Sequence, residues 1–165
     1  MSIAKSILPE FNHEMANTRK LLERVPEEQG AWKPHPKSYS LGELAMHIAN
    51  IPTWVVVTLK QDSLEFDAAN RGPKPAFETR RTLLERFDDN VFAAVSAIAD
   101  ADDDEMRKPW TLKNGDKVMF SLPKVAVLRS FIVNHLIHHR GQLTVYLRLK
   151  NVPLPAIYGN SADER

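Results

Sequence analysis

Three of the six histidines of this chain lie in one stretch, residues 131–150, which reads FIVNHLIHHRGQLTVYLRLK. His135 and His139 are four residues apart, which is about one turn of an α-helix. Both fall on the apolar stripe of the predicted helix, whereas His138 falls to one side of it. Two imidazoles stacked one turn apart can form half of a metal site. The alternative is that both are core histidines that hydrogen-bond to their neighbours.

A third histidine, His47, lies on another predicted helix. Ser40 and Glu43 form a capping box that marks the start of this helix, which we expect to run to about residue 59. Pro52 should kink the helix or restart it. His47 lies at the flank of the apolar stripe, where a boundary histidine is the alternative to a metal ligand. Glu43, one turn earlier, is a candidate to hydrogen-bond the distal nitrogen of His47, although capping alone explains its presence.

The rest of the chain must position these histidines. Amphipathic spacing predicts further helices over residues 3–25 and 77–99, and the helix of His135 and His139 is expected to begin after Ser121 and run to about residue 150. Asn114-Gly115 separates two short extended segments and predicts a small β-hairpin between the last two helices. Ser121 is then expected to cap the final helix. Polar or proline-containing stretches predict long connections at residues 25–39 and 61–76 and a tail from residue 151 onward. The acidic run at residues 100–105 is expected to be a solvated loop.

The length indicates one domain over residues 1–165, and four amphipathic helices around one core indicate an all-α four-helix bundle. The chain has no cysteine, so any metal must be held by His, Asp or Glu. Lys and Arg total 22 against 21 Asp and Glu, a balance that argues against a nucleic-acid partner. We find neither a signal-peptide pattern nor an apolar run long enough for a membrane. A cytoplasmic protein is therefore expected.

If the two histidine-bearing helices are neighbours, His47, His135 and His139 converge. Three nitrogen ligands leave a fourth coordination position for water or substrate, which is the arrangement of catalytic rather than structural sites. The Glu-x-x-His pairs of di-iron bundles are missing from the last helix, so a dinuclear site is not expected. Candidates for the wall of a pocket beside the metal are Trp32, Tyr39, Trp54 and Gln142. No residue stands out as a general base.

Two segments, LGELAMHIA at 41–49 and NHLIHHRGQL at 134–143, resemble the signature regions of the DinB-like (DinB/YfiT) metal-binding proteins. The tail over 152–159 also resembles theirs. The resemblance implies an up-down-down-up four-helix bundle that carries one divalent metal on three histidines, which map to His47, His135 and His139. It implies less about activity, because relatives include thiol-dependent S-transferases, a thiol-dependent isomerase and many members with no assigned reaction.

Two functions remain open. The first is a divalent-metal-dependent enzyme, a thiol-dependent S-transferase or a hydrolase, that acts on a small-molecule substrate. The second is a non-catalytic metal-binding or stress-response interaction protein. Imidazole ligands accept Zn, Ni or Fe, so the ligand set does not identify the metal, and a low-molecular-weight thiol is the cofactor that the resemblance suggests. A homodimer is expected because relatives often pair and homodimers are the commonest oligomers.

Overall fold

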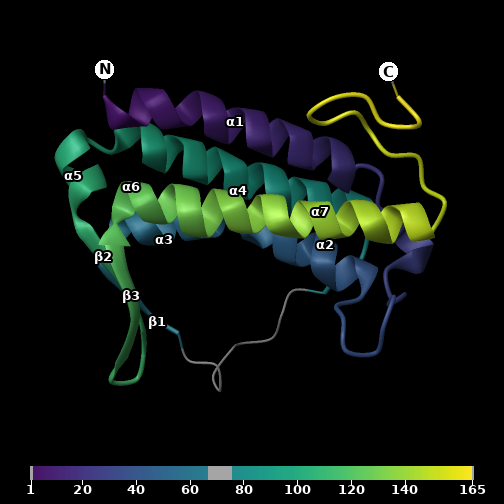
Figure 1. The fold of residues 1–165 in the computed structure, drawn as a ribbon, viewed down its shortest axis with the longest axis horizontal. Helices are drawn as coiled ribbons and strands as arrows, with labels where there is room; N and C mark the ends of the chain where they lie inside the picture. The colour runs from purple at the N-terminus through teal and green to yellow at the C-terminus, as the bar shows by residue number, and fades with distance from the viewer. Residues whose placement is uncertain (1, 67–75, 165) are drawn as a thin grey trace.

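The computed structural model describes residues 2–66 and 76–164 and is mostly helical, with a small three-stranded sheet beside one end of the helices (Figure 1). Most of the predicted 61–76 connection lies outside the described residues. The elements are α1 (Ile3–Leu22), a 3₁₀ turn (Glu27–Gln29), α2 (Leu41–Asn50), α3 (Thr53–Lys60), β1 (Ser63–Glu65), α4 (Arg80–Asp100), α5 (Asp103–Arg107), β2 (Pro109–Asn114), β3 (Lys117–Pro123), α6 (Lys124–Ala126), a π-helical segment (Val127–Val133) and α7 (Asn134–Leu149).

The long helices lie side by side and enclose one apolar core (Figure 1). α1 and α2 each contact both α4 and α7, and α3 continues the line of α2 along α4. The largest fully buried apolar side chains in this core come from α1, α2 and α4, and include Phe11, Leu44, Ile48 and Phe87. Within the part of the chain that is described, no helix has the length and apolarity needed to cross a bilayer.

The start of the His47 helix is as predicted. The Ser40 hydroxyl accepts the backbone N–H of Glu43, and the Glu43 carboxylate accepts the backbone N–H of Ser40, so both halves of the capping box are present. The predicted 40–59 helix is divided at Pro52, where α2 ends at Asn50 and α3 begins at Thr53. Proline has no backbone N–H to continue the hydrogen-bond ladder, which explains the restart.

The predicted hairpin is present as β2 and β3, which pair antiparallel through the turn after Asn114. Gly115 adopts φ +57°, a left-handed conformation that glycine tolerates without steric cost. The predicted cap at Ser121 is wrong, because Ser121 lies within β3 opposite Thr111 and the helix begins only after Pro123. β1, which pairs parallel to β2, has no counterpart in the sequence prediction.

The acidic run at 100–105 is not a loop throughout, contrary to the prediction. Asp102 caps a short helix, α5, by accepting the backbone N–H of Glu105 at 2.7 Å. Carboxylates in the first turn of a helix are stabilised by its dipole. The acidic run that follows the end of α4 therefore favours the start of α5. The last predicted helix, which was expected to begin after Ser121, is helical from Lys124 to Leu149 but passes through a wider π-helical segment, Val127–Val133, directly before the histidines.

Candidate metal centre

The structure brings together the three histidines that the sequence singled out. His47 comes from α2, and His135 and His139 come from α7. The Nε2 atom of His135 lies 3.3 Å from Nε2 of His47 and 2.8 Å from Nε2 of His139. All three side chains are half-buried, and their ligand atoms lie within 4.8 Å of one another. They form the one cluster of at least three His, Cys, Asp or Glu ligands found among the described residues.

Packing of α2 against α7 holds the rings in place. Ile48 follows His47 and is fully buried, which fixes the rotation of α2 about its axis. On α7, Leu136 and Leu143 are fully buried on either side of His139 in the sequence. The four-residue spacing of His135 and His139 stacks their rings on one side of the helix, with ring centroids 4.6 Å apart.

The donor set fits a divalent metal ion. A ring nitrogen of a neutral imidazole offers either one proton or one lone pair, so Nε2 of His135 cannot pair fully with both of the ring nitrogens that face it. A cation that accepts a lone pair from each ring would satisfy all three at once. Zinc bound tetrahedrally to nitrogen at about 2.0–2.1 Å separates two ligand nitrogens by about 3.3 Å, close to the observed spacing of His47 and His135.

The electrostatics keep the rings of His135 and His139 neutral, as metal ligands must be. Burial lowers the pKa of His135 to about 4, and the neighbouring His139 and His138 add to the effect. Burial also lowers the pKa of His139, a shift that its hydrogen bond to Gln142 opposes. Both rings are therefore uncharged at neutral pH and can offer a lone pair to a cation.

Two residues predicted to wall the pocket lie directly beside the histidines. The Tyr39 ring is tilted against His47 at a centroid distance of 5.7 Å. Gln142 lies with Oε1 2.7 Å from Nδ1 of His139. Trp54 is one ring further away, since it packs against Phe131 at 5.1 Å and Phe131 in turn lies 5.9 Å from His135.

Trp32 and Glu43 are placed by other contacts. Trp32 lies edge-on to Tyr146 at 5.8 Å and under the ammonium of Lys150 at 5.0 Å, so it packs against the C-terminal part of α7. The Glu43 carboxylate caps α2 and lies 3.4 Å from the Lys33 ammonium. These capping and ion-pair contacts account for Glu43 without a bond to His47.

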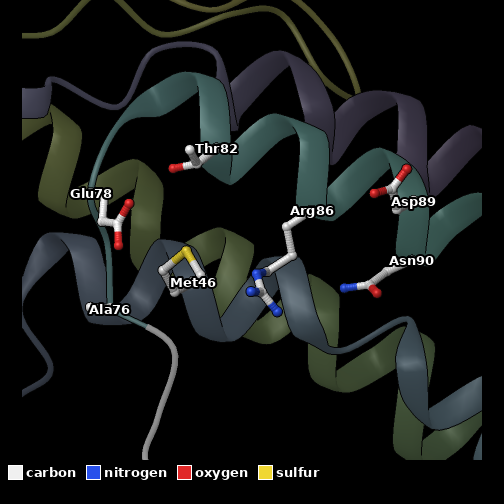
Figure 2. Close-up of a pocket in the computed structure, with 7 residues that line it drawn as sticks. All are labelled: Met46, Ala76, Glu78, Thr82, Arg86, Asp89 and Asn90. Atoms are coloured by element: carbon white, nitrogen blue, oxygen red, sulfur yellow. The ribbon is translucent and has the colours of Figure 1, made fainter.

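Two pockets in the described part of the chain lie beside α2 and away from the three rings. The first, of ≈ 460 Å³, is lined by Met46 of α2 and by residues of α4 and the segment before it, and Arg86 extends across it from α4 toward α2 (Figure 2). The second, of ≈ 610 Å³, is lined by Phe77 and by several carboxylates, among them Glu28 and Glu78. Neither lining includes a histidine of the cluster.

A buried ion pair next to the site was missed from the sequence. Arg140, which follows His139, is 2 % exposed, and its Nη2 lies 2.7 Å from Oε2 of Glu14 on α1. The Tyr158 hydroxyl from the tail donates to the same carboxylate at 2.6 Å. The signal was present, because Arg140 continues the spacing of the buried leucines Leu136, Leu143 and Leu147. The pair ties the helix of His135 and His139 to α1 and to the tail.

Comparison with known proteins shows the family and agrees with this fold. The profile of the DinB family matches residues 1–164, and the chain belongs to that family. It is 27 % identical over 162 residues to the uncharacterized protein YrdA of Bacillus subtilis (strain 168), covering 95 % of this chain and 89 % of the relative.

Two solved structures share the fold. A DinB-like protein from Bacillus cereus ATCC 10987 superposes with a TM-score of 0.72 at 22 % identity, covering 93 % of this chain and 97 % of that one. The DinB-like protein YjoA from Bacillus subtilis superposes with a TM-score of 0.71 at 18 % identity, covering 94 % and 99 %. At these identities the likeness establishes the fold and leaves the activity open.

Proposed function

We propose that the chain binds one divalent metal ion, Zn, Ni or Fe, through His47, His135 and His139, and is a metal-dependent enzyme. The observation that carries this proposal is the convergence of three Nε2 atoms from two helices in a half-buried cluster. We take these three histidines as the protein ligands, and three protein ligands leave a fourth coordination position for water or substrate. An open position is what separates catalytic from structural sites of this kind.

The reaction that best fits the site is a transfer or hydrolysis with an externally supplied nucleophile. A divalent ion held here would supply Lewis acidity, which lowers the pKa of water or of a low-molecular-weight thiol. The chain has no cysteine, so a thiol nucleophile must come from a small molecule. The protein's own part is to orient the rings, through Gln142 on His139, and to border them with the aromatic side chains of Tyr39 and Phe131.

We further propose that the long helices form the up-down-down-up four-helix bundle that the sequence resemblance implies. The contacts of α1 and α2 with both α4 and α7 support this arrangement. A cytoplasmic homodimer is the assembly that we propose. Val145 and Leu149, one turn apart on α7, are 57 % and 58 % exposed and offer an apolar surface for a second copy. Light scattering at micromolar concentration tests the dimer, and a monomeric mass would remove it.

A second function, a non-catalytic metal-binding or interaction protein, needs the same three histidines. Substrate-binding sites are usually concave, so a pocket that opens on the metal would favour the enzyme. A metal closed off by a fourth protein ligand would favour the non-catalytic function.

Metal analysis followed by cobalt substitution tests the proposal. The purified protein should hold one divalent ion per chain, and the triple variant of His47, His135 and His139 to alanine should hold none. Co²⁺-loaded protein should change its visible absorption when L-cysteine is added, because an exogenous thiol can reach an open position. Stoichiometric cobalt with no response to L-cysteine would favour the non-catalytic function. Absence of bound metal would overturn both.

A further inference from the structure

The side chain of Gln142 contacts the ring nitrogen of His139 that does not face His135. Oε1 of Gln142 lies 2.7 Å from Nδ1 of His139, a normal hydrogen-bond distance. An amide oxygen accepts and cannot donate, so the ring nitrogen that faces it must carry the hydrogen. A neutral imidazole has only one N–H, and Nε2 of His139 is therefore left with its lone pair. That lone pair is directed at Nε2 of His135, 2.8 Å away.

The hydrogen bond depends on the helix and not on the packing of the core. Gln142 follows His139 by three residues, a spacing that places two side chains on the same side of α7. Gln142 is exposed, and replacing it removes no buried contact. Its loss should therefore change the state of the His139 ring while leaving the fold in place.

The arrangement also defines the state of His135. Because His139 presents a lone pair at Nε2, the short contact with His135 is a hydrogen bond only if Nε2 of His135 is the donor. Without metal, His135 should thus be the Nε2–H tautomer and His139 the Nδ1–H tautomer. His139 is then ready to act as a ligand, whereas His135 must first move its proton to Nδ1.

We propose that Gln142 is the positioning residue of the metal site, which holds His139 in its ligand tautomer before any metal arrives. This inference rests on the proposed metal-binding function. Partners that orient ligand histidines typically change metal affinity by about 10–100-fold when they are removed. Gln142→Leu should therefore weaken Zn²⁺ binding by about that factor, and Gln142→Glu should restore it because the carboxylate also accepts from Nδ1–H.

The first experiment needs no metal. Protein labelled with ¹⁵N-histidine and stripped of metal is examined by long-range ¹H–¹⁵N NMR at pH 8, where the tautomer of each ring can be assigned. His139 should be the Nδ1–H tautomer in the parent and in Gln142→Glu, and should lose that preference in Gln142→Leu. Gln61→Leu, the same change at an exposed position at the end of α3, should behave as the parent. An Nε2–H tautomer for His139 in the parent would overturn the inference.

The second experiment measures Zn²⁺ affinity by competition with a chromophoric chelator in the same four proteins. A loss of about 10–100-fold in Gln142→Leu alone supports the positioning role. Equal affinity in all four would overturn that role, even if the tautomer changes as expected. If even the parent fails to bind Zn²⁺, Ni²⁺ or Fe²⁺, the proposed function fails and the positioning role fails with it. The NMR result then still decides whether Gln142 sets the tautomer, so the two failures are distinguishable.

Discussion

The Nε2 atoms of His47 and His135 lie 3.3 Å apart although the two residues are 88 positions apart in the chain. One lies on α2 and the other on α7, two helices that contact each other directly. An ion bound between them can exist only while these helices are packed together. Binding to the native state alone stabilises that state by mass action, so metal binding and folding are thermodynamically coupled.

His47→Ala should therefore lose most of the metal-dependent stabilisation. In the parent, metal at about 100 times its Kd adds about 2.7 kcal/mol to the free energy of unfolding. Without His47, the remaining pair on α7 binds more weakly and no longer connects two helices. The apo variant should still fold, since the capping box and the buried side chains of α2 are untouched. Melting temperatures measured with and without added Zn²⁺ or Ni²⁺ check this prediction.

His138→Ala is the matched control, because His138 is exposed and lies outside the cluster although it adjoins His139. His138→Ala should retain most of the metal-dependent rise in melting temperature. His135→Ala and His139→Ala should each abolish stoichiometric metal binding. An equal shift in His47→Ala and the parent would rule out the three-histidine site. A site that depends on His138 would mean that the ligands on α7 have been assigned wrongly.

The metal-free protein should become less stable as the pH falls below about 6.5. The pKa of His135 is lowered by burial to about 4 in the folded chain, against 6.5 for an ordinary histidine. Between these values the unfolded chain takes up a proton that the folded chain refuses, so stability rises with pH across this window. Burial also lowers the pKa of His139, so His139 adds to the loss of stability at low pH.

Urea unfolding of the apo protein at several pH values between 4 and 7.5 measures how the free energy of unfolding changes with pH. His135→Asn, which cannot titrate, should reduce the loss of stability between pH 6.5 and 4. Above pH 7 the two proteins should show the same pH dependence, because His135 is neutral in both the folded and unfolded parent. An unchanged slope in the variant would mean that His135 is not the titrating group.

The helices could be predicted because their apolar residues repeat with the helical period. That period identified the long helices and put His135 and His139 on the same side of one of them. The β1 strand could not be predicted, since Ser63–Glu65 is short and its parallel pairing with β2 depends on residues far away in the sequence. Ser121 has the chemistry of a helix cap, but strand pairing with Thr111 places it in the sheet instead.

For the site, the sequence predicted which histidines cluster better than it predicted their surroundings. Ligand type and spacing are local properties, so His47, His135 and His139 could be named. Which aromatic side chain borders which ring depends on how the helices pack, and Trp32, a loop residue like Tyr39, lies against Tyr146 and not beside the histidines. Gln142 was named as a candidate for the pocket wall, but its contact with Nδ1 of His139 needed the geometry.

Removing the helix cap of Ser40 should cost stability. Ser40→Ala deletes the hydroxyl that accepts the Glu43 N–H and should lower the free energy of unfolding by about 1 kcal/mol. Ser121→Ala is the natural comparison, because Ser121 lies in β3 and caps no helix. It should change stability by no more than about 0.5 kcal/mol. Urea denaturation of both variants is the measurement, and an equal cost at the two positions would contradict the capping role of Ser40.

The ion pair between Glu14 and Arg140 should be among the most costly interactions to break. Both side chains are almost fully buried, at 9 % and 3 % exposure, and Arg140 also donates to the backbone carbonyl of Glu14 at 3.1 Å. Removing one partner leaves a buried charge without compensation, which typically costs about 3–5 kcal/mol. Glu14→Gln and Arg140→Met should each approach that loss in urea unfolding, with the tail contact of Tyr158 weakened as well.

The double variant Glu14→Gln, Arg140→Met should lose much less than the sum of the two single changes, because neither charge is then left unpaired. The exposed pair Arg81 and Glu85 on α4 provides the contrast, since i,i+4 pairs at a helix surface are screened by solvent and contribute little to stability. Because Arg140 follows His139 directly, the single variants should also weaken Zn²⁺ binding by letting α7 move relative to α2. Additive losses together with unchanged metal affinity would show that the pair neither stabilises α7 nor supports the site.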